Sequence, residues 1–314
     1  MAMPRVSVLM PMRNMERYVA DAARSVLAQE YRDLELVVVD DGSADRSRAI
    51  VEGLGDPRVR VVPGVCRGFS AAVNTAFGAA RGEILMECDA DDLFPPGRVG
   101  EQVRLLEVSP QFGAVCGGFS TISPAGDLLA RCWDPASAEG DITEELLRGE
   151  TRTHLCTFAI RRECVDALGG MREFFETGSD IDLQLRLAER CRVAFQPVER
   201  YRYRLHDASV THAQSSARRQ FFETYARELR AQRAAGGTDE LERGMPRAAP
   251  VTGGARDRLA DQLAGLLLGE AWRRHRRGEK LASIALGLRA LARTPTSAGS
   301  WRSVAALVVK RAGE

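Results

Sequence analysis

Three aspartates that follow a short apolar run could bind a metal ion. Residues 84–86 predict a buried strand, and Asp89, Asp91 and Asp92 come where that strand should end. An open α/β sheet binds its ligand at the carboxyl ends of its strands. The D-x-D arrangement suits Mg²⁺ or Mn²⁺, which bind carboxylate oxygens and complete their shell with water and substrate phosphates. The alternative is a polar turn that caps the helix beginning near Pro96.

A second group of polar residues could supply a general base. Asp180 and Asp182 fall in the first turn of a helix predicted within residues 176–190. Helix capping explains one of these carboxylates, but a partly desolvated aspartate can also accept a proton from a hydroxyl group. His206, one of four histidines, follows a strand-like segment at 201–205. A lone histidine is either a metal ligand or an ordinary surface or core residue.

Alternating strands and helices in the first hundred residues should position these groups. Periodicity predicts strands at 6–10, 34–39, 59–62 and 84–86. Helices are predicted at 19–27, at 43–54 with Ser43 as its cap, and at 69–80. This order implies right-handed βαβ crossovers and a mostly parallel sheet covered on both faces, so the fold class is α/β.

Two loops at predicted strand ends carry polar groups that a core does not need. They are residues 11–14 (Pro-Met-Arg-Asn) and 40–43 (Asp-Asp-Gly-Ser), both expected at the sheet edge that holds the aspartates. An aspartate there can bind a nucleobase or a ribose, although a carboxylate beside glycine is also ordinary turn chemistry. The sequence has neither a G-x-G-x-x-G after the first strand nor a P-loop, so any phosphates would be held by metal.

Composition limits the class of protein. The chain has 314 residues, of which 45% are hydrophobic and 28% charged, with a net charge of +1, which argues against a general nucleic-acid binder. Seven cysteines without a C-x-x-C pair indicate reduced thiols and a cytoplasmic protein. The first strand begins too early to leave room for a signal peptide, and no apolar run reaches the length of a membrane span.

The composition changes after residue 216. An arginine-rich helix is followed by a segment at about 234–256 that has the composition of a flexible linker, and then by apolar helical patterns at 259–267, 281–291 and 301–308. A basic cluster beside these helices could lie on anionic lipid, peripheral to the inner face of the membrane, or form a solvated helix face. It consists of Arg273, Arg274, Arg276, Arg277 and Lys280.

Five blocks of sequence resemble a family 2 glycosyltransferase of the GT-A fold. They occur in the family's order over residues 5–212 and read VSVLMPMRN, LELVVVDDGSADRS, GFSAAVNTAFGAARGEILMECDADD, GSDIDLQLRL and YRLHDASVT. The resemblance implies a Rossmann-like, mostly parallel central sheet flanked by helices, with a small C-terminal helical region. It implies a catalytic domain over 1–215, with a nucleotide-sugar half at about 1–100 and an acceptor half at about 101–215. Residues 216–314 would then form a helical extension.

The resemblance also assigns roles to residues. It implies that nucleotide-sugar contacts come from the first two loops and from the D-x-D motif. Because Val73 stands where the family commonly has an arginine, Arg13 or Arg67 is expected to supply the missing positive charge near the nucleotide. The residues expected in these contacts are Pro11, Arg13, Asn14, Asp41, Arg67, Asp89, Ala90 and Asp91. It implies metal ligands at Asp91, Asp92 and His206, and a catalytic base at Asp180. Ser179 stands where the family often has glutamate, which leaves the acceptor undefined.

The function expected from this resemblance is metal-dependent, inverting transfer of a sugar. The donor would be a nucleotide diphosphosugar, with a UDP-sugar favoured, and the cation Mn²⁺ or Mg²⁺. The acceptor would be a hydroxyl of a glycan or of a lipid-linked molecule, in glycan or cell-surface polysaccharide biosynthesis, with no role for nucleic acid. The alternatives are a nucleotidyltransferase, which would normally have a basic, glycine-rich first loop, and a non-catalytic module that binds nucleotide sugar.

Overall fold

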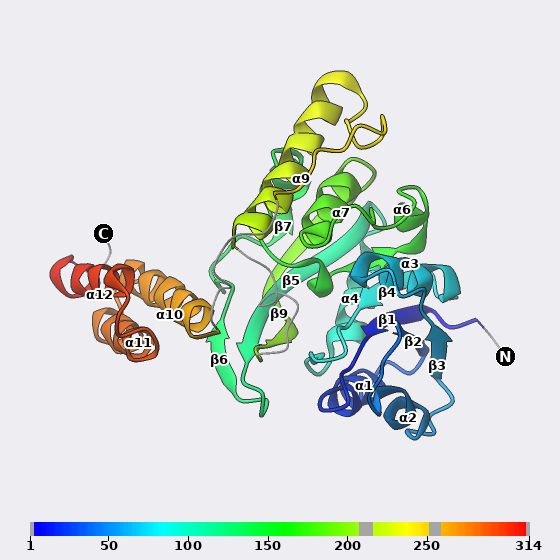
Figure 1. The fold of residues 1–314 in the computed structure, drawn as a ribbon, viewed down its shortest axis with the longest axis horizontal. Helices are drawn as coiled ribbons and strands as arrows, with labels where there is room; N and C mark the ends of the chain where they lie inside the picture. The colour runs from blue at the N-terminus through cyan, green and yellow to red at the C-terminus, as the bar shows by residue number, and fades with distance from the viewer. Residues whose placement is uncertain (1–2, 207–215, 251–258, 312–314) are drawn as a thin grey trace.

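An α/β domain and a group of C-terminal helices make up the computed structural model, which describes residues 3–206, 216–250 and 259–311 (Figure 1). The strands are β1 (Val6–Met12), β2 (Leu34–Asp40), β3 (Val59–Pro63), β4 (Ile84–Glu87), β5 (Phe112–Ile122), β6 (Leu128–Arg131), β7 (Gly140–Asp141), β8 (Ala159–Arg161) and β9 (Arg192–Arg204). The helices of the α/β domain are α1 (Val19–Leu27), α2 (Ser47–Glu52), α3 (Phe69–Ala79), α4 (Arg98–Val108), α5 (Thr143–Leu147), α6 (Arg162–Asp166) and α7 (Ser179–Ala188). They are followed by α9 (Ser216–Gly236), α10 (Leu259–Arg276), α11 (Lys280–Arg293) and α12 (Ala298–Val309).

One sheet runs through the α/β domain in the order β3-β2-β1-β4-β8-β5-β9-β7, with β6 paired to β5. The first four strands are parallel, as predicted, so their carboxyl ends lie at one edge. The second half is mixed, because β8 runs antiparallel to both β4 and β5 while β5 and β9 run parallel. The α/β fold class is therefore confirmed, with a parallel first half of the sheet and a mixed remainder.

Two hydrophobic layers cover the faces of this sheet. Alternate residues of β1 point to opposite sides, as the two-residue period of a strand requires. Val8 and Met10 pack in the layer that includes α1 and α4, whereas Leu9 packs in the layer that includes α3 and α7. Because β1 is buried on both faces, its apolar run is continuous, which is typical of a central parallel strand.

The helices predicted in this half are confirmed, but the cap predicted for α2 is wrong. Helix α2 begins at Ser47, and Asp45 rather than Ser43 accepts a hydrogen bond from the Ser47 amide, at 2.9 Å. The Ser43 amide instead donates to Asp40 Oδ1 at 2.9 Å, within the loop after β2. A serine four residues upstream therefore shapes the loop, while Asp45, which precedes the N-cap residue Arg46, accepts from the first amide of the helix.

The C-terminal helices form a separate group beside β6 (Figure 1). Four members of the predicted basic cluster make polar contacts. Arg273 donates to the Arg131 carbonyl at 2.8 Å, and Arg277 pairs with Asp134. Arg274 donates to Glu270 at 3.1 Å, and Lys280 donates to the Lys310 carbonyl at 3.0 Å. Among the described residues, no helix combines the length and the apolar character needed to cross a membrane. Arg273 and Arg277 thus join α10 to the α/β domain.

Before these helices, α9 and the segment after it pack on α7 and its neighbours. Asp239 is fully buried and pairs with Arg172 at 2.7 Å and with Arg233. Asp239 lies inside the segment at about 234–256 that has a linker composition, of which the structure describes residues up to 250. Ion pairs hold the described part in place together with apolar contacts, since Leu241 and Ala249 pack against the cluster that includes Phe222 and Tyr225.

Candidate active site

The loop after β4 brings three carboxylates together. Ligand oxygens of Asp89, Asp91 and Asp92, which we call the acidic loop, all lie within 4.8 Å of one another. The loop follows β4, which is parallel to β1, and β1 is parallel to β2. It therefore lies at the same sheet edge as the loops after those two strands, as the sequence predicted.

Strand β9 fixes the shape of the acidic loop. The buried Tyr201 hydroxyl accepts a hydrogen bond from the Asp89 amide at 2.9 Å. The Arg204 amide donates to Asp92 Oδ1 at 2.6 Å, and the Arg204 side chain donates to the Asp91 carbonyl at 2.6 Å. The carboxylates are thus held close together by residues more than a hundred positions later in the chain.

The electrostatics of the loop favour a bound cation. Burial raises the pKa of Asp89 and of Asp92 well above the usual range, and neighbouring carboxylates, Glu87 for Asp89 and Asp91 for Asp92, raise it further. Asp89 Oδ1 and Asp92 Oδ2 are buried without a hydrogen-bond partner among the described residues. Oxygen ligands that repel one another and lack donors fit a hard divalent cation such as Mg²⁺ or Mn²⁺.

His206 closes one side of the loop. Its Nε2 lies 2.8 Å from Asp91 Oδ2, and its ring packs on Tyr18 with the ring centroids 4.6 Å apart. The side chain is buried, so this contact holds both Asp91 and the imidazole in one orientation. Of the residues predicted to bind metal, the structure therefore joins His206 to Asp91, and Asp91 to Asp92 within the acidic loop.

Asp180 lies at the start of α7 and faces the same region. Its side chain is 33% exposed, and Asp180 Oδ2 lies 3.7 Å from His154 Nδ1. Burial and the charge of Asp180 raise the pKa of Glu87 to about 8, and the Asp180 charge also contributes to the raised pKa of Asp89. Asp180 is therefore partly open to solvent at the start of α7, with its charge acting on Glu87 and Asp89.

Asp182 points into the protein instead. It is fully buried and pairs with Arg186 at 2.8 Å and with Arg172 at 3.6 Å. Residues two apart on a helix face different directions, so α7 presents Asp180 outward and Asp182 inward. The two carboxylates that the sequence could not separate have different surroundings.

The first two loops are tied to each other. Asn14 adopts a left-handed conformation with φ of 56°, its amide donates to Ser43 Oγ at 3.1 Å, and its Oδ1 accepts from the Ala44 amide at 2.8 Å. Asn14 therefore shapes the edge of the predicted nucleotide pocket. Pro11 is buried within β1, and Ala90 is buried in the acidic loop.

Asp41 lies against the segment after β3. It is buried, and its Oδ1 accepts a hydrogen bond from the Cys66 amide at 2.6 Å. Of the two arginines predicted near the nucleotide, Arg13 is exposed, and Arg67 is exposed and pairs with Glu173 at 3.2 Å. The structure thus joins Asp41 to the rim of the site, while Arg67 is engaged with the segment before α7.

Residues 7–178 match the family model described as "Glycosyl transferase family 2". The chain belongs to this family. It is 30% identical to the putative glycosyltransferase EpsE of Bacillus subtilis over 192 residues, which cover 59% of this chain and 67% of EpsE. The matched segments span only 35% and 26% of the lengths of two other curated relatives.

Two solved structures share the family 2 fold. TarS 1-349 of S. aureus in complex with UDP-GlcNAc superposes with a TM-score of 0.60 and 15% identity, covering 93% of this chain and 82% of that chain. The mannosyltransferase PcManGT of Pyrobaculum calidifontis, in complex with GDP-Man and Mn²⁺, superposes with a TM-score of 0.51 and 21% identity. The match covers 97% of this chain and 79% of that chain. At these identities the likeness shows the fold, and the resemblance to a GT-A glycosyltransferase is confirmed.

Several residues of this family 2 site were not predicted. His154 precedes a short 3-10 turn, and no periodicity or motif singles it out. Its ring packs edge-on against Phe119 and parallel to Tyr203, with centroids 4.5 Å and 6.3 Å apart. Tyr201 and Arg204 were not predicted because their role depends on the position of β9 beside the acidic loop. That position is set by strand pairing between distant parts of the chain.

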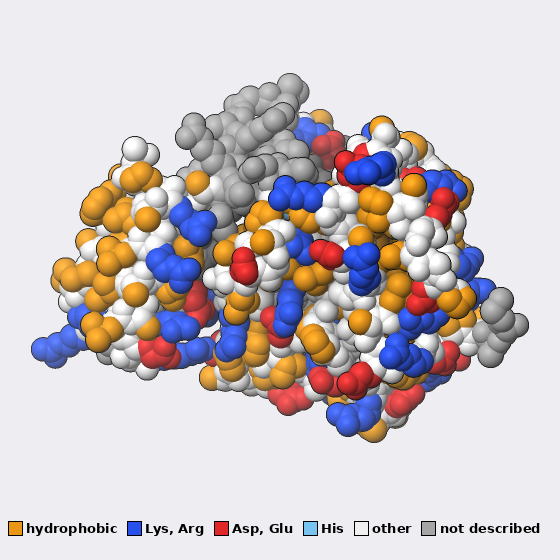
Figure 2. All heavy atoms as spheres, turned by 90° about the horizontal axis from the view of Figure 1, so that it is seen from below, with side chains coloured by type: hydrophobic (Ala, Val, Ile, Leu, Met, Phe, Trp, Pro, Cys, Tyr) orange, Lys and Arg blue, Asp and Glu red, His pale blue; other side chains and the backbone are white. Residues whose placement is uncertain are grey.

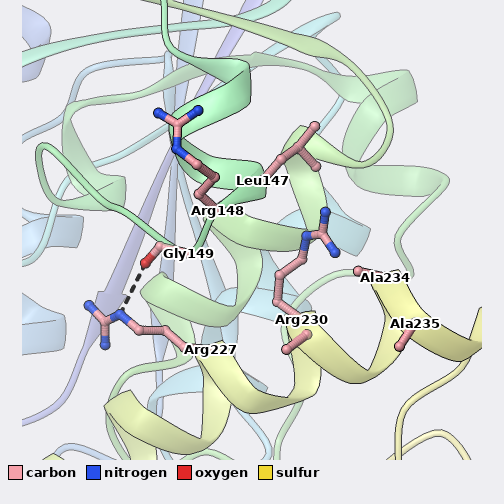
Figure 3. A pocket seen from close by; sticks show the side chains of 8 residues that line it. Leu147, Arg148, Gly149, Arg227, Arg230, Ala234 and Ala235 are labelled. Atoms are coloured by element: carbon pink, nitrogen blue, oxygen red, sulfur yellow. Dashed lines mark hydrogen bonds between the residues drawn. The ribbon is translucent and has the colours of Figure 1, made fainter.

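A cavity of about 380 Å³ lies between the end of α5 and α9 (Figure 3). Its lining comprises Leu147, Arg148, Gly149, Arg227, Arg230, Ala231, Ala234 and Ala235. Arg227 donates to the Gly149 carbonyl at 3.1 Å, and Arg230 lies 3.2 Å from Glu189. Two of its arginines are thus used to hold α9 against the α/β domain, and no residue of the acidic loop lines it.

Proposed function

We propose that this protein is a metal-dependent, inverting glycosyltransferase that moves a sugar from a nucleotide diphosphosugar to a hydroxyl acceptor. The observation that carries the proposal is the acidic loop, whose three ligand oxygens lie within 4.8 Å of one another, together with Asp180, which is 33% exposed at the start of α7. Family 2 membership and the nucleotide sugars in TarS and PcManGT support it.

Each part of the site would have one task. Asp91, Asp92 and His206 would hold Mn²⁺ or Mg²⁺, with Asp89 beside them, and such a cation acts as a Lewis acid toward the charge on a leaving diphosphate. Asp41 and the loop shaped by Asn14 would bind the nucleoside.

Asp180 would accept the proton of the acceptor hydroxyl, and His154 would orient its carboxylate. The hydroxyl would then attack the anomeric carbon from the side opposite the departing diphosphate. That direct displacement inverts the configuration.

We further propose a UDP-sugar as donor and a glycan or lipid-linked acceptor, in glycan or cell-surface polysaccharide biosynthesis. The UDP-GlcNAc bound to TarS supports uridine as the nucleoside of the donor. The proposed role in polysaccharide biosynthesis is supported by an alignment with the chondroitin synthase of Pasteurella multocida. That alignment has 27% identity and covers 59% of this chain and 19% of that protein. A cytoplasmic location is proposed because all seven cysteines are free thiols, which reducing compartments maintain.

Thermal stability with a panel of nucleotide diphosphosugars, with and without Mn²⁺, tests the donor and the metal. Selective binding stabilises the fold by about 2.7 kcal/mol at a hundred times Kd, so the donor should raise the melting temperature only when Mn²⁺ is present. Asp91→Asn should remove that metal dependence and abolish release of nucleoside diphosphate, with an unchanged melting temperature for the protein alone. Full activity of Asp91→Asn in chelator-treated buffer would exclude the metal site.

A further inference from the structure

The outward faces of α11 and α12 are apolar. Leu281 and Leu288 on α11 are 85% and 53% exposed, and Trp301 and Val308 on α12 are 55% and 48% exposed. A spacing of seven residues places each pair on one face of its helix. Alanines extend both faces, and Val309 is 81% exposed at the end of α12. We call these two surfaces the outer apolar face.

Small residues explain why the large ones point outward. Ser283, Gly287 and Ala290 are the positions of α11 that are buried among its neighbours, together with Leu291. A Cβ added at Gly287 would lie 3.1 Å from Leu307 and 3.2 Å from Val304, so glycine lets α12 approach closely. The apolar pattern predicted for residues 281–291 is confirmed as helical, but Leu281 and Leu288 do not contribute to the core between the helices.

Cationic residues dominate the charge around the outer apolar face, with the exposed Glu279 at the start of α11 as the neighbouring acidic residue. Residues 280–311 contain six cationic residues and neither aspartate nor glutamate. The six are Lys280, Arg289, Arg293, Arg302, Lys310 and Arg311, and all except the half-buried Lys280 are exposed. Figure 2 shows hydrophobic side chains over the C-terminal helices, with Lys and Arg among them. A surface that is both apolar and cationic complements an anionic one.

We propose that the outer apolar face binds the surface of an anionic lipid bilayer. Leu281, Leu288 and Val308 would enter the boundary between headgroups and acyl chains, as the apolar face of an interfacial helix does. Trp301 suits the same depth, because indole rings favour the membrane interface. The surrounding cations would be attracted by anionic headgroups. A second copy of this chain would bring like charges together, which disfavours self-association through this face.

This proposal differs from the expectation drawn from the basic cluster at residues 273–280. Arg273 and Arg277 are committed to contacts with the α/β domain, so the lipid-binding cations would be those of α11 and α12. The inference does not depend on the proposed transferase activity, because none of the site residues lies in these helices. Failure of one proposal would therefore leave the other standing.

Sedimentation of the full chain with vesicles tests the proposal. Vesicles of phosphatidylcholine with phosphatidylglycerol are compared with phosphatidylcholine alone. We expect binding to the anionic vesicles that weakens as salt rises, because salt shortens the Debye length. Leu281→Glu combined with Leu288→Glu should weaken binding at least tenfold. Val108→Glu is the matched control, because Val108 is 71% exposed on α4, and it should bind like the natural chain.

A charge variant separates lipid binding from loss of folding. Arg289→Gln with Arg302→Gln leaves the apolar residues intact and should reduce both the affinity for anionic vesicles and its salt dependence. Melting temperatures of all variants should match the natural chain, since every substituted residue is exposed. Three results would overturn the proposal: no binding to anionic vesicles at low salt, equal binding by the double glutamate variant, or a dimer that this variant converts to monomer.

Discussion

At the scale of single residues, substitution of Asp180 should lower the rate of transfer, whereas substitution of Asp182 should lower the stability of the fold. Asp180→Asn keeps the shape of a half-exposed side chain but removes the proposed base, so transfer should slow by about 10² to 10⁴ while donor and Mn²⁺ binding change little. Asp182→Asn leaves the buried guanidinium of Arg186 without its carboxylate partner, while Arg172 keeps Asp239 and Glu242, and this should cost on the order of 3 kcal/mol of stability. Single-turnover rates and urea unfolding of both variants measure the two effects.

The outcome for Asp182 decides how the base is assigned. From sequence, both aspartates occupy the first turn of one helix, so the loss of a helix-end charge, about 0.3 to 1 kcal/mol, is the effect expected of Asp182. The structure replaces this with a larger loss, because Arg186 and Arg172 lie against a fully buried carboxylate. A stable but inactive Asp182→Asn, beside an active Asp180→Asn, would reverse our assignment.

At the scale of elements, Glu35 links the amino ends of the parallel strands. This buried carboxylate on β2 accepts hydrogen bonds from Ser7 on β1 at 2.7 Å, from Arg60 on β3 at 2.9 Å, and from the Arg81 side chain before β4 at 2.7 Å. Burial opposes its ionisation, but the hydrogen bonds from Arg81, Ser7 and Arg60 outweigh it and lower the pKa of Glu35 from 4.5 to about 2. The ionised form is therefore favoured in the folded state.

This lowered pKa gives a signed prediction for acid stability. The pKa of Glu35 is 4.5 in the unfolded chain, so above pH 4.5 its ionised form contributes its full stabilisation to the fold. That contribution disappears as the pH falls toward 2. Glu35→Gln should therefore lower the free energy of unfolding by about 3 kcal/mol at pH 7 and flatten its dependence on pH between 4.5 and 2. Urea unfolding across this range measures it. Glu52→Gln, at a half-exposed pair with Arg48, should leave the pH profile unchanged.

The local patterns of the helices and strands explain which parts of the fold and the site could be predicted from the sequence. Strands and helices over residues 6–108 were predictable because each has a strong period and a local turn signal. The location of the acidic loop at the edge of the sheet was predictable, because Asp89 and Asp91 follow the end of a predicted strand. What could not be predicted is the support from Tyr201 and Arg204, because pairing between β9 and the acidic loop is a contact between distant parts of the chain. The outward direction of Leu281 likewise depends on which face of α11 its neighbours cover.

At the scale of the whole molecule, the site and the C-terminal helices are joined through few polar contacts. Every predicted site residue precedes residue 207, and the family match ends at 178. The joint we describe consists of the Arg273 contact with the Arg131 carbonyl and the Arg277 pair with Asp134. The first of these contacts is a single hydrogen bond. The second is an ion pair near the surface, where an isolated pair contributes little to stability. We therefore expect the α/β domain with α9 to fold without α10, α11 and α12.

A chain ending at residue 250 tests this division. It should keep the Mn²⁺-dependent rise in melting temperature with donor, and Asp91→Asn in this shorter chain should remove the rise, because the acidic loop and His206 are intact. It should lose sedimentation with anionic vesicles. In the full chain, Arg273→Ala with Arg277→Ala should speed proteolysis between the α/β domain and α10 without changing donor binding. A shorter chain that folds but binds no donor would mean that the C-terminal helices belong to the catalytic unit.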